Sequence, residues 1–131
     1  MGERRTIGTV LEAARSRLER LTPEDALAAT RDGAVLIDTR CAELRLEAGV
    51  VPGAVHIPLS VLYWRLDPSS PNRNPAVADL DRQVILLCAH GYSSSLAAAT
   101  LLDLGFARAT DVVGGFEAWA AAGLPVASVV D

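Results

Sequence analysis

The sequence predicts an α/β fold in which helices cover both faces of a mostly parallel sheet. Two short aliphatic runs, at 34–38 and 84–88, each end at a polar residue or a cysteine, as buried parallel strands do. The segments between and around such runs have helical spacing or helix-capping residues. Strands that alternate with helices in this way are typical of a parallel sheet.

Composition limits the classes of function. Half of the 131 residues are hydrophobic and the net charge is −4, which fits one globular domain. No basic block is present, so neither a nucleic acid nor a membrane is expected as a partner. No apolar run of membrane length and no signal-peptide pattern is found, which predicts a cytoplasmic protein with Cys41 and Cys88 reduced.

Two helices are expected before the first strand. Apolar residues at steps of three and four predict an amphipathic helix from Thr6 to Arg20. We treat residues 1–20 as an N-terminal helical extension that packs on its own domain or across a homodimer. The main domain, 21–131, then begins with a helix capped by Thr22, which Gly33 ends.

The rest of the chain continues the alternation. The expected elements are a strand at 34–38, a short helix at 42–48, a short strand bounded by Pro58, a helix at 59–66, an irregular loop at 67–79, a strand at 84–88, a helix at 93–104, a strand at 109–113 and a last short helix. The last helix carries Trp119, which we expect to anchor the core.

Cys88 is the strongest candidate for chemistry. It lies at the carboxyl end of the most apolar strand, where open parallel sheets bind ligands. Gly91 lets the following loop curl tightly, so that the N–H groups of 89–94 can converge on the sulfur. Such surroundings lower a thiol pKa from about 8.5 to as low as roughly 3.5–7.5. The alternative is that Cys88 is simply a small buried apolar residue.

The loop Cys88-Ala89-His90-Gly91-Tyr92-Ser93-Ser94 resembles the active-site loop of the rhodanese family. Three further segments agree with the resemblance: Asp38-Thr39-Arg40, the stretch from Gly49 to Pro58, and Gly114-Gly115-Phe116-Glu117-Ala118-Trp119 running to Pro125. Together they span about 21–126. The four segments in this order are a more specific signal than any one of them.

The resemblance implies a three-layer α/β/α rhodanese-like fold with a five-stranded, mostly parallel sheet. It also implies a sulfurtransferase. Cys88 would take sulfane sulfur from a small donor (thiosulfate, a low-molecular-weight persulfide or mercaptopyruvate) and pass it from a persulfide to cyanide or a thiol. No metal and no organic cofactor is implied. The substrate would be bound by the loop residues Ala89, His90, Gly91, Tyr92, Ser93 and Ser94.

The loop departs from the family pattern in its charge. Many rhodanese loops carry Arg where this chain has Ser93, and thiosulfate-using animal enzymes have cations where Ala89 and His90 stand. Losing a charge-assisted clamp costs about 1.5–3 kcal/mol of anion binding. We therefore expect weak use of thiosulfate and a less charged donor. The Ser93 hydroxyl is also similar to mercaptopyruvate-using relatives. Ser93 and Ser94 are further expected to cap the following helix.

For residues outside the loop, the sequence allows both a structural role and a role in the active site. Asp38 and Arg40 end a neighbouring strand, where they either face the site or form an ion pair that supports the loops. Cys41 follows them and is either a resolving thiol for Cys88 or an ordinary loop cysteine. Arg65 precedes the Pro-rich loop, and closing over the site would return a cation to it.

Two rival functions remain. A phosphatase of the tyrosine-phosphatase pattern needs an Arg six residues after the cysteine, where this chain has Ser94. The other rival is a sulfur carrier or partner-binding regulatory module with little turnover of its own. The retained Cys88 argues against an inert domain.

Overall fold

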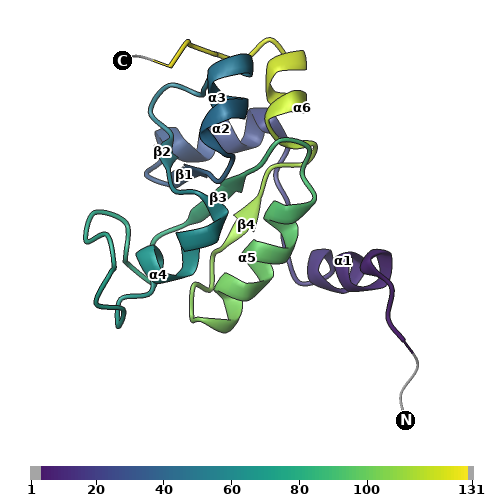
Figure 1. The fold of residues 1–131 in the computed structure, drawn as a ribbon, viewed down its shortest axis with the longest axis vertical. Helices are drawn as coiled ribbons and strands as arrows, with labels where there is room; N and C mark the ends of the chain where they lie inside the picture. The colour runs from purple at the N-terminus through teal and green to yellow at the C-terminus, as the bar shows by residue number, and fades with distance from the viewer. Residues whose placement is uncertain (1–3, 130–131) are drawn as a thin grey trace.

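Four parallel strands form the centre of the protein. The computed structural model describes residues 4–129, and its sheet has the order β2-β1-β3-β4 (Figure 1). The strands are β1 (Val35–Asp38), β2 (Val55–His56), β3 (Val84–Leu87) and β4 (Thr110–Asp111). The central strands β1 and β3 pair along their whole length, with Val35 opposite Val84 and Asp38 opposite Leu87. The predicted α/β fold with a parallel sheet is confirmed.

The expected fifth strand is reduced to a single bridge. Leu21 makes an isolated parallel bridge with Val112, just beyond β4. Its N–H donates to the Asp111 carbonyl at 3.1 Å, and its carbonyl accepts from Val113 at 2.8 Å. Pro23 follows two residues later and has no N–H to donate. Because the chain enters the next helix at once, the five-stranded prediction is wrong by this one strand.

Residues 4–129 form six α-helices, of which α2 to α6 cover the sheet. They are α1 (Ile7–Arg15), α2 (Pro23–Arg31), α3 (Ala42–Ala48), α4 (Leu62–Leu66), α5 (Ser93–Asp103) and α6 (Gly115–Ala121), with a 3-10 turn (Leu59–Val61) before α4. Thr22 caps α2 as expected, since its hydroxyl accepts from the Asp25 N–H at 3.1 Å.

The first helix is shorter than its apolar spacing predicts. It ends at Arg15 rather than Arg20, and Ser16 forms its C-cap. The chain then turns, so that Leu21 reaches β4 and Arg20 pairs with the buried Asp111. These tertiary contacts replace the last helical turn.

Side chains of the sheet alternate between two cores. Val35, Ile37, Val84 and Leu86 face helices α4 and α5, together with Phe106 and Leu101. Leu36, Ile85 and Leu87 face α2 and α6, together with Val112, Phe116 and Trp119. Trp119 is fully buried and donates its indole N–H to the Pro125 carbonyl at 2.9 Å, as expected of a core anchor.

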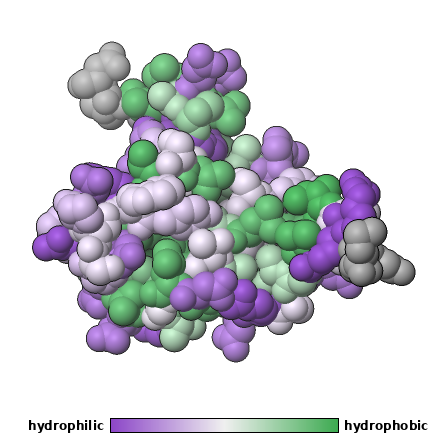
Figure 2. Space-filling model, turned by 60° about the horizontal axis from the view of Figure 1, so that its bottom comes forward, coloured by the Kyte–Doolittle hydropathy of each residue, from purple (hydrophilic) through white to green (hydrophobic). Residues whose placement is uncertain are grey.

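Helix α1 lies outside this three-layer body and packs against α5 (Figure 1). Ala14 is its one buried residue, and Ile7 at its start is 71% exposed. Figure 2 shows hydrophobic surface beside the N-terminal residues at this side of the molecule. Among residues 4–129, none of the helices has the length and apolar character needed to cross a membrane.

Candidate active site

Cys88 lies directly after β3, with its side chain turned into the following loop. The residue is 6% exposed. Its Sγ accepts a hydrogen bond from the Gly91 N–H at 3.1 Å. The same Sγ lies 3.2 Å from the Ser94 hydroxyl oxygen, at the start of α5. The sulfur is therefore enclosed by polar groups and is not sealed among aliphatic side chains.

The turn at Gly114 and Gly115 packs closely against the Cys88 loop. The Phe116 N–H donates to the Cys88 carbonyl at 2.8 Å, and the Glu117 N–H donates to the Ala89 carbonyl at 3.1 Å. A side chain at Gly115 would overlap the Cys88 carbonyl oxygen. Gly91 has φ +82°, and a Cβ there would lie 2.7 Å from the Gly114 nitrogen. The loop and this turn thus approach each other more closely than side chains permit.

The surroundings lower the pKa of the Cys88 thiol. Burial is the largest single influence and raises this pKa, because it disfavours the charged sulfur. Hydrogen bonds from the Ser94 hydroxyl and N–H, the Ser93 hydroxyl and the Gly91 N–H together outweigh it. The N–H groups of Gly91 and Ser94 supply amide contacts of the kind that the loop sequence predicts. The arrangement favours a thiolate, the nucleophilic form of cysteine.

Behind the sulfur lies a buried carboxylate that the sequence analysis missed. The hydroxyls of Ser94 and Ser95 each donate to Asp111 Oδ2 at 2.7 Å. Arg20 donates from Nε to Asp111 Oδ1 at 2.8 Å and from Nη2 to Oδ2 at 3.2 Å. Asp111 is fully buried in β4. A charged residue within a predicted buried strand was the available signal, because such a residue needs a buried partner.

Two arginines of the N-terminal segment contact the loop itself. Arg15 donates to the Gly91 carbonyl at 2.7 Å, and Arg20 donates to the same oxygen at 3.1 Å. Arg15 also donates to the Ser95 hydroxyl at 3.1 Å and lies over the Tyr92 ring, 5.4 Å from its centroid. The segment expected to be a separate extension thus touches the candidate active site.

The two loop serines do not cap α5. The helix begins at Ser93, the cap position is Tyr92, and no side-chain cap bond is made there. Ser94 lies inside the first turn, where its buried hydroxyl is committed to Asp111. The capping prediction is wrong because both serines lie inside the helix, with Tyr92 at the cap.

Three loop side chains face outward. His90, Tyr92 and Ser93 are exposed, whereas Ala89 is partly covered. His90 Nδ1 lies 2.7 Å from Glu117 Oε2 on α6, and both side chains are largely exposed. These groups are placed to meet a substrate or solvent.

Asp38 and Arg40 form a buried ion pair. Arg40 Nη2 lies 2.7 Å from Asp38 Oδ2, and both side chains are almost fully buried. The Arg40 guanidinium also lies over the Phe116 ring at 3.9 Å from its centroid and donates to the Gly49 carbonyl at 2.8 Å. This pair therefore links the end of β1 to Phe116 and Gly49.

A pocket of about 340 Å³ adjoins the outer side of the loop. It is lined by Arg40, Leu44, Ala48, Ala89, His90, Phe116, Glu117 and Ala120. Its lining is mostly apolar. The organic part of a small molecule fits such a surface.

The other predicted site residues lie elsewhere. Cys41 is exposed at the N-cap of α3 and makes no cap bond. Arg65 in α4 donates to the Asn72 carbonyl at 3.0 Å, so its guanidinium is bound to the Pro-rich loop. Within residues 4–129, its hydrogen bonds do not reach the Cys88 loop.

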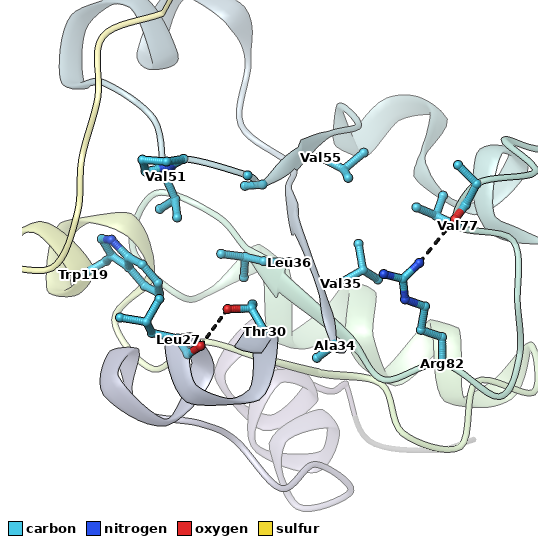
Figure 3. Close-up of a pocket in the computed structure, with 14 residues that line it drawn as sticks. Leu27, Thr30, Ala34, Val35, Leu36, Val51, Val55, Val77, Arg82 and Trp119 are labelled. Atoms are coloured by element: carbon cyan, nitrogen blue, oxygen red, sulfur yellow. Dashed lines mark hydrogen bonds between the residues drawn. The ribbon is translucent and has the colours of Figure 1, made fainter. Parts of the chain in front are cut away.

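A second cavity has a volume of about 480 Å³, and Figure 3 shows the residues that line it. Leu27 and Thr30 of α2, Leu36, Val51 and Trp119 line it together with Arg82. None of the residues 88–94 lines this cavity. In the described part of the chain, no three His, Cys, Asp or Glu side chains gather as metal ligands.

Comparisons with known proteins identify the family of this chain. A family model for the rhodanese-like domain matches residues 22–122. The thiosulfate sulfurtransferase GlpE of Pseudomonas savastanoi pv. phaseolicola is 39% identical over 81% of this chain and 91% of its own. That of Pseudomonas entomophila is 38% identical over 79% and 86%. A solved structure from Rhodopseudomonas palustris CGA009, described as a possible tyrosine phosphatase, is 33% identical, covers 97% of this chain and 98% of its own, and has a TM-score of 0.86.

Proposed function

The chain belongs to the rhodanese-like domain family, and from this we propose that it is a sulfurtransferase that carries sulfur as a persulfide on Cys88. One observation carries the proposal. The Cys88 sulfur accepts the Gly91 N–H at the carboxyl end of the central strand β3, in surroundings that lower its pKa. A thiolate held in this way is a ready nucleophile.

The reaction has two displacement steps. The Cys88 thiolate attacks the sulfane sulfur of the donor, and the bond between that sulfur and the rest of the donor breaks. Its electron pair leaves with sulfite from thiosulfate, with a thiolate from a persulfide, or with the enolate of pyruvate from mercaptopyruvate, which then takes up a proton. A thiolate or cyanide then attacks the outer sulfur of the Cys88 persulfide, and the Cys88 thiolate leaves. The loop N–H groups stabilise the sulfur anion before the first step and after the second.

The distribution of charge supports a weakly charged donor. The loop side chains Ala89, His90, Tyr92 and Ser93 include no guanidinium. Arg40 is paired with Asp38. Arg15 and Arg20 both donate to the Gly91 carbonyl. We therefore expect a low-molecular-weight persulfide or mercaptopyruvate to be used better than thiosulfate. The apolar pocket beside His90 is where we place the organic part of the donor or acceptor.

Donor use is tested by steady-state rates with thiosulfate, glutathione persulfide and mercaptopyruvate. We expect kcat/KM to be lowest with thiosulfate. Fast turnover with thiosulfate alone would contradict this choice of donor, though not the persulfide on Cys88. That persulfide is tested by mass spectrometry after donor treatment, which should add the mass of one sulfur atom to Cys88. A Cys88→Ser variant is the control and should gain none.

These two experiments separate the enzyme from a carrier module, and a third tests for a phosphatase. A carrier module would gain the sulfur but release it slowly to small acceptors. Persulfide formation on Cys88 without turnover would therefore favour a carrier module. A phosphatase needs a cationic clamp, and the position six residues after Cys88 is Ser94, whose hydroxyl is bound to Asp111. We expect no hydrolysis of an aryl phosphate, and rapid hydrolysis would contradict the proposal.

A further inference from the structure

Ser94 stands between the reactive sulfur and a buried carboxylate. Its hydroxyl oxygen lies 3.2 Å from Cys88 Sγ and 2.7 Å from Asp111 Oδ2. One hydroxyl therefore bridges the two groups, and the carboxylate oxygen is no more than about 6 Å from the sulfur. At that separation a like charge shifts a pKa appreciably.

The hydroxyl has only one hydrogen to give. A carboxylate can only accept, so the short contact with Asp111 takes that hydrogen. Ser94 then offers the sulfur a lone pair, which suits the S–H of the neutral thiol. The thiolate instead needs a donor, so the hydroxyl has to turn toward the sulfur and leave Asp111. Asp111 and the Cys88 thiolate thus compete for the same hydrogen.

Arg20 is placed to settle this competition. It pairs with both oxygens of Asp111, at 2.8 and 3.2 Å, and its side chain is largely buried. Ser95 also donates to Oδ2 at 2.7 Å. When the Ser94 hydroxyl turns away, Asp111 therefore keeps three hydrogen bonds, two from Arg20 and one from Ser95. The cation also offsets a negative charge that would otherwise repel the thiolate.

We propose that Arg20 is a positioning residue for Cys88: its pairing with Asp111 releases the Ser94 hydroxyl to the ionised sulfur. Its second bond, from Nη2 to the Gly91 carbonyl at 3.1 Å, helps hold the residue whose N–H meets that sulfur. Arg20 lies outside the matched family segment, which begins at residue 22. The chain before that segment thus completes the active site.

The other charged groups around the loop are not substituted in the test. They are Arg15 from α1, which bonds to the Gly91 carbonyl, the pair Asp38 and Arg40 from the end of β1, and the pair His90 and Glu117 from the loop and α6. Each of them is present in every variant below. Differences between variants therefore report on Arg20 and Asp111.

The test is the pH dependence of Cys88 alkylation by iodoacetamide, which reacts with the thiolate. All variants carry Cys41→Ser, because Cys41 is an exposed second thiol. Arg20→Gln leaves Asp111 unneutralised, so the midpoint should rise by on the order of one pH unit. Asp111→Asn removes the competing negative charge, so the midpoint should fall. The double variant should return close to the parent, and Arg20→Lys, which keeps the charge, should shift less than Arg20→Gln.

Arg17→Gln is the matched control. Arg17, like Arg20, follows helix α1, but it pairs with the exposed Asp103. The midpoint of Cys88 alkylation should therefore not change in this variant. Arg20→Gln and Asp111→Asn shifting in the same direction, or neither shifting more than the control, would overturn the inference. Simple loss of packing would move both variants the same way. If circular dichroism shows Arg20→Gln unfolded, the nearly isosteric Asp111→Asn decides alone: a fall supports the inference, and no fall overturns it.

This inference rests on the proposed function only in taking Cys88 as the reacting group. The alkylation midpoint is measured without any sulfur donor. Failure of Cys88 to gain a sulfur atom in the parent protein would reject the proposed function. An alkylation midpoint that does not change when Arg20 is replaced would reject this inference. The two failures are therefore distinguishable.

Discussion

Gly91 contacts the Cys88 sulfur on one side and the N-terminal segment on the other. Its N–H lies 3.1 Å from Sγ, while its carbonyl accepts from Arg15 at 2.7 Å and from Arg20 at 3.1 Å. The orientation of one glycine thus links the first helix to the reactive sulfur. Changes at either side of Gly91 should be felt at Cys88.

Replacing Gly91 itself should be costly. Gly91→Ala places a side chain at φ +82°, a strain of about 1–2 kcal/mol, and brings its Cβ to 2.7 Å from the Gly114 nitrogen. We expect a lower melting temperature by circular dichroism. Gly53→Ala is the control, because Gly53 has φ +84° but nothing within 4 Å of the added Cβ. Equal losses in the two variants would show that the approach to Gly114 is unimportant.

Removing the Ser94 hydroxyl should raise the pKa of Cys88. Burial, which raises this pKa, would act with one lowering hydrogen bond fewer. Ser94→Ala should therefore slow iodoacetamide alkylation near neutral pH by roughly tenfold, the effect of one hydrogen bond to a charged group. Thr100→Ala, also in α5, removes an exposed hydroxyl that bonds to the Leu96 carbonyl. A matching slowdown in that control would mean that the effect is not local to the sulfur.

The lowered pKa of Cys88 predicts two dependences on pH. The alkylation midpoint of Cys88 should lie below that of an ordinary thiol, because the folded protein favours the thiolate. Between the folded and unfolded pKa values, the unfolded state holds more protons. The contribution of Cys88 to the free energy of unfolding should therefore rise with pH across that interval and be lost below the folded pKa. Comparing urea unfolding of the parent and Cys88→Ser over pH checks the sign, and a contribution that falls across the interval would contradict it.

The buried pair beside the loop should be important for stability. Asp38→Asn removes the carboxylate that meets Arg40 at 2.7 Å and Arg45 at 3.4 Å, which leaves buried positive charge uncompensated. We expect a loss of about 3–5 kcal/mol in the free energy of unfolding, measured in urea. Asp103→Asn breaks the exposed pair with Arg17 and should change stability little. Similar losses in both variants would contradict the role given to burial.

Much of the fold follows from local patterns. The aliphatic run before Cys88 forms β3, and Thr22 caps α2 through the Asp25 N–H, because strand burial and capping depend on neighbouring residues. The expected fifth strand fails for a local reason as well, since Pro23 follows Leu21 so closely. The end of the aliphatic strand and the glycine after it likewise located Cys88 and Gly91, which the structure brings into contact.

The sequence by itself determined the parallel α/β fold, the position of Cys88 after its central strand and the glycine that curls the loop. Only the tertiary structure decided that Arg20 meets Asp111 and that both act around Ser94, because these residues come from three separate segments. The amphipathic spacing up to Arg20 predicted one continuous helix. A buried carboxylate instead requires a charged partner, and this requirement draws the chain out of the helix and against the active-site loop.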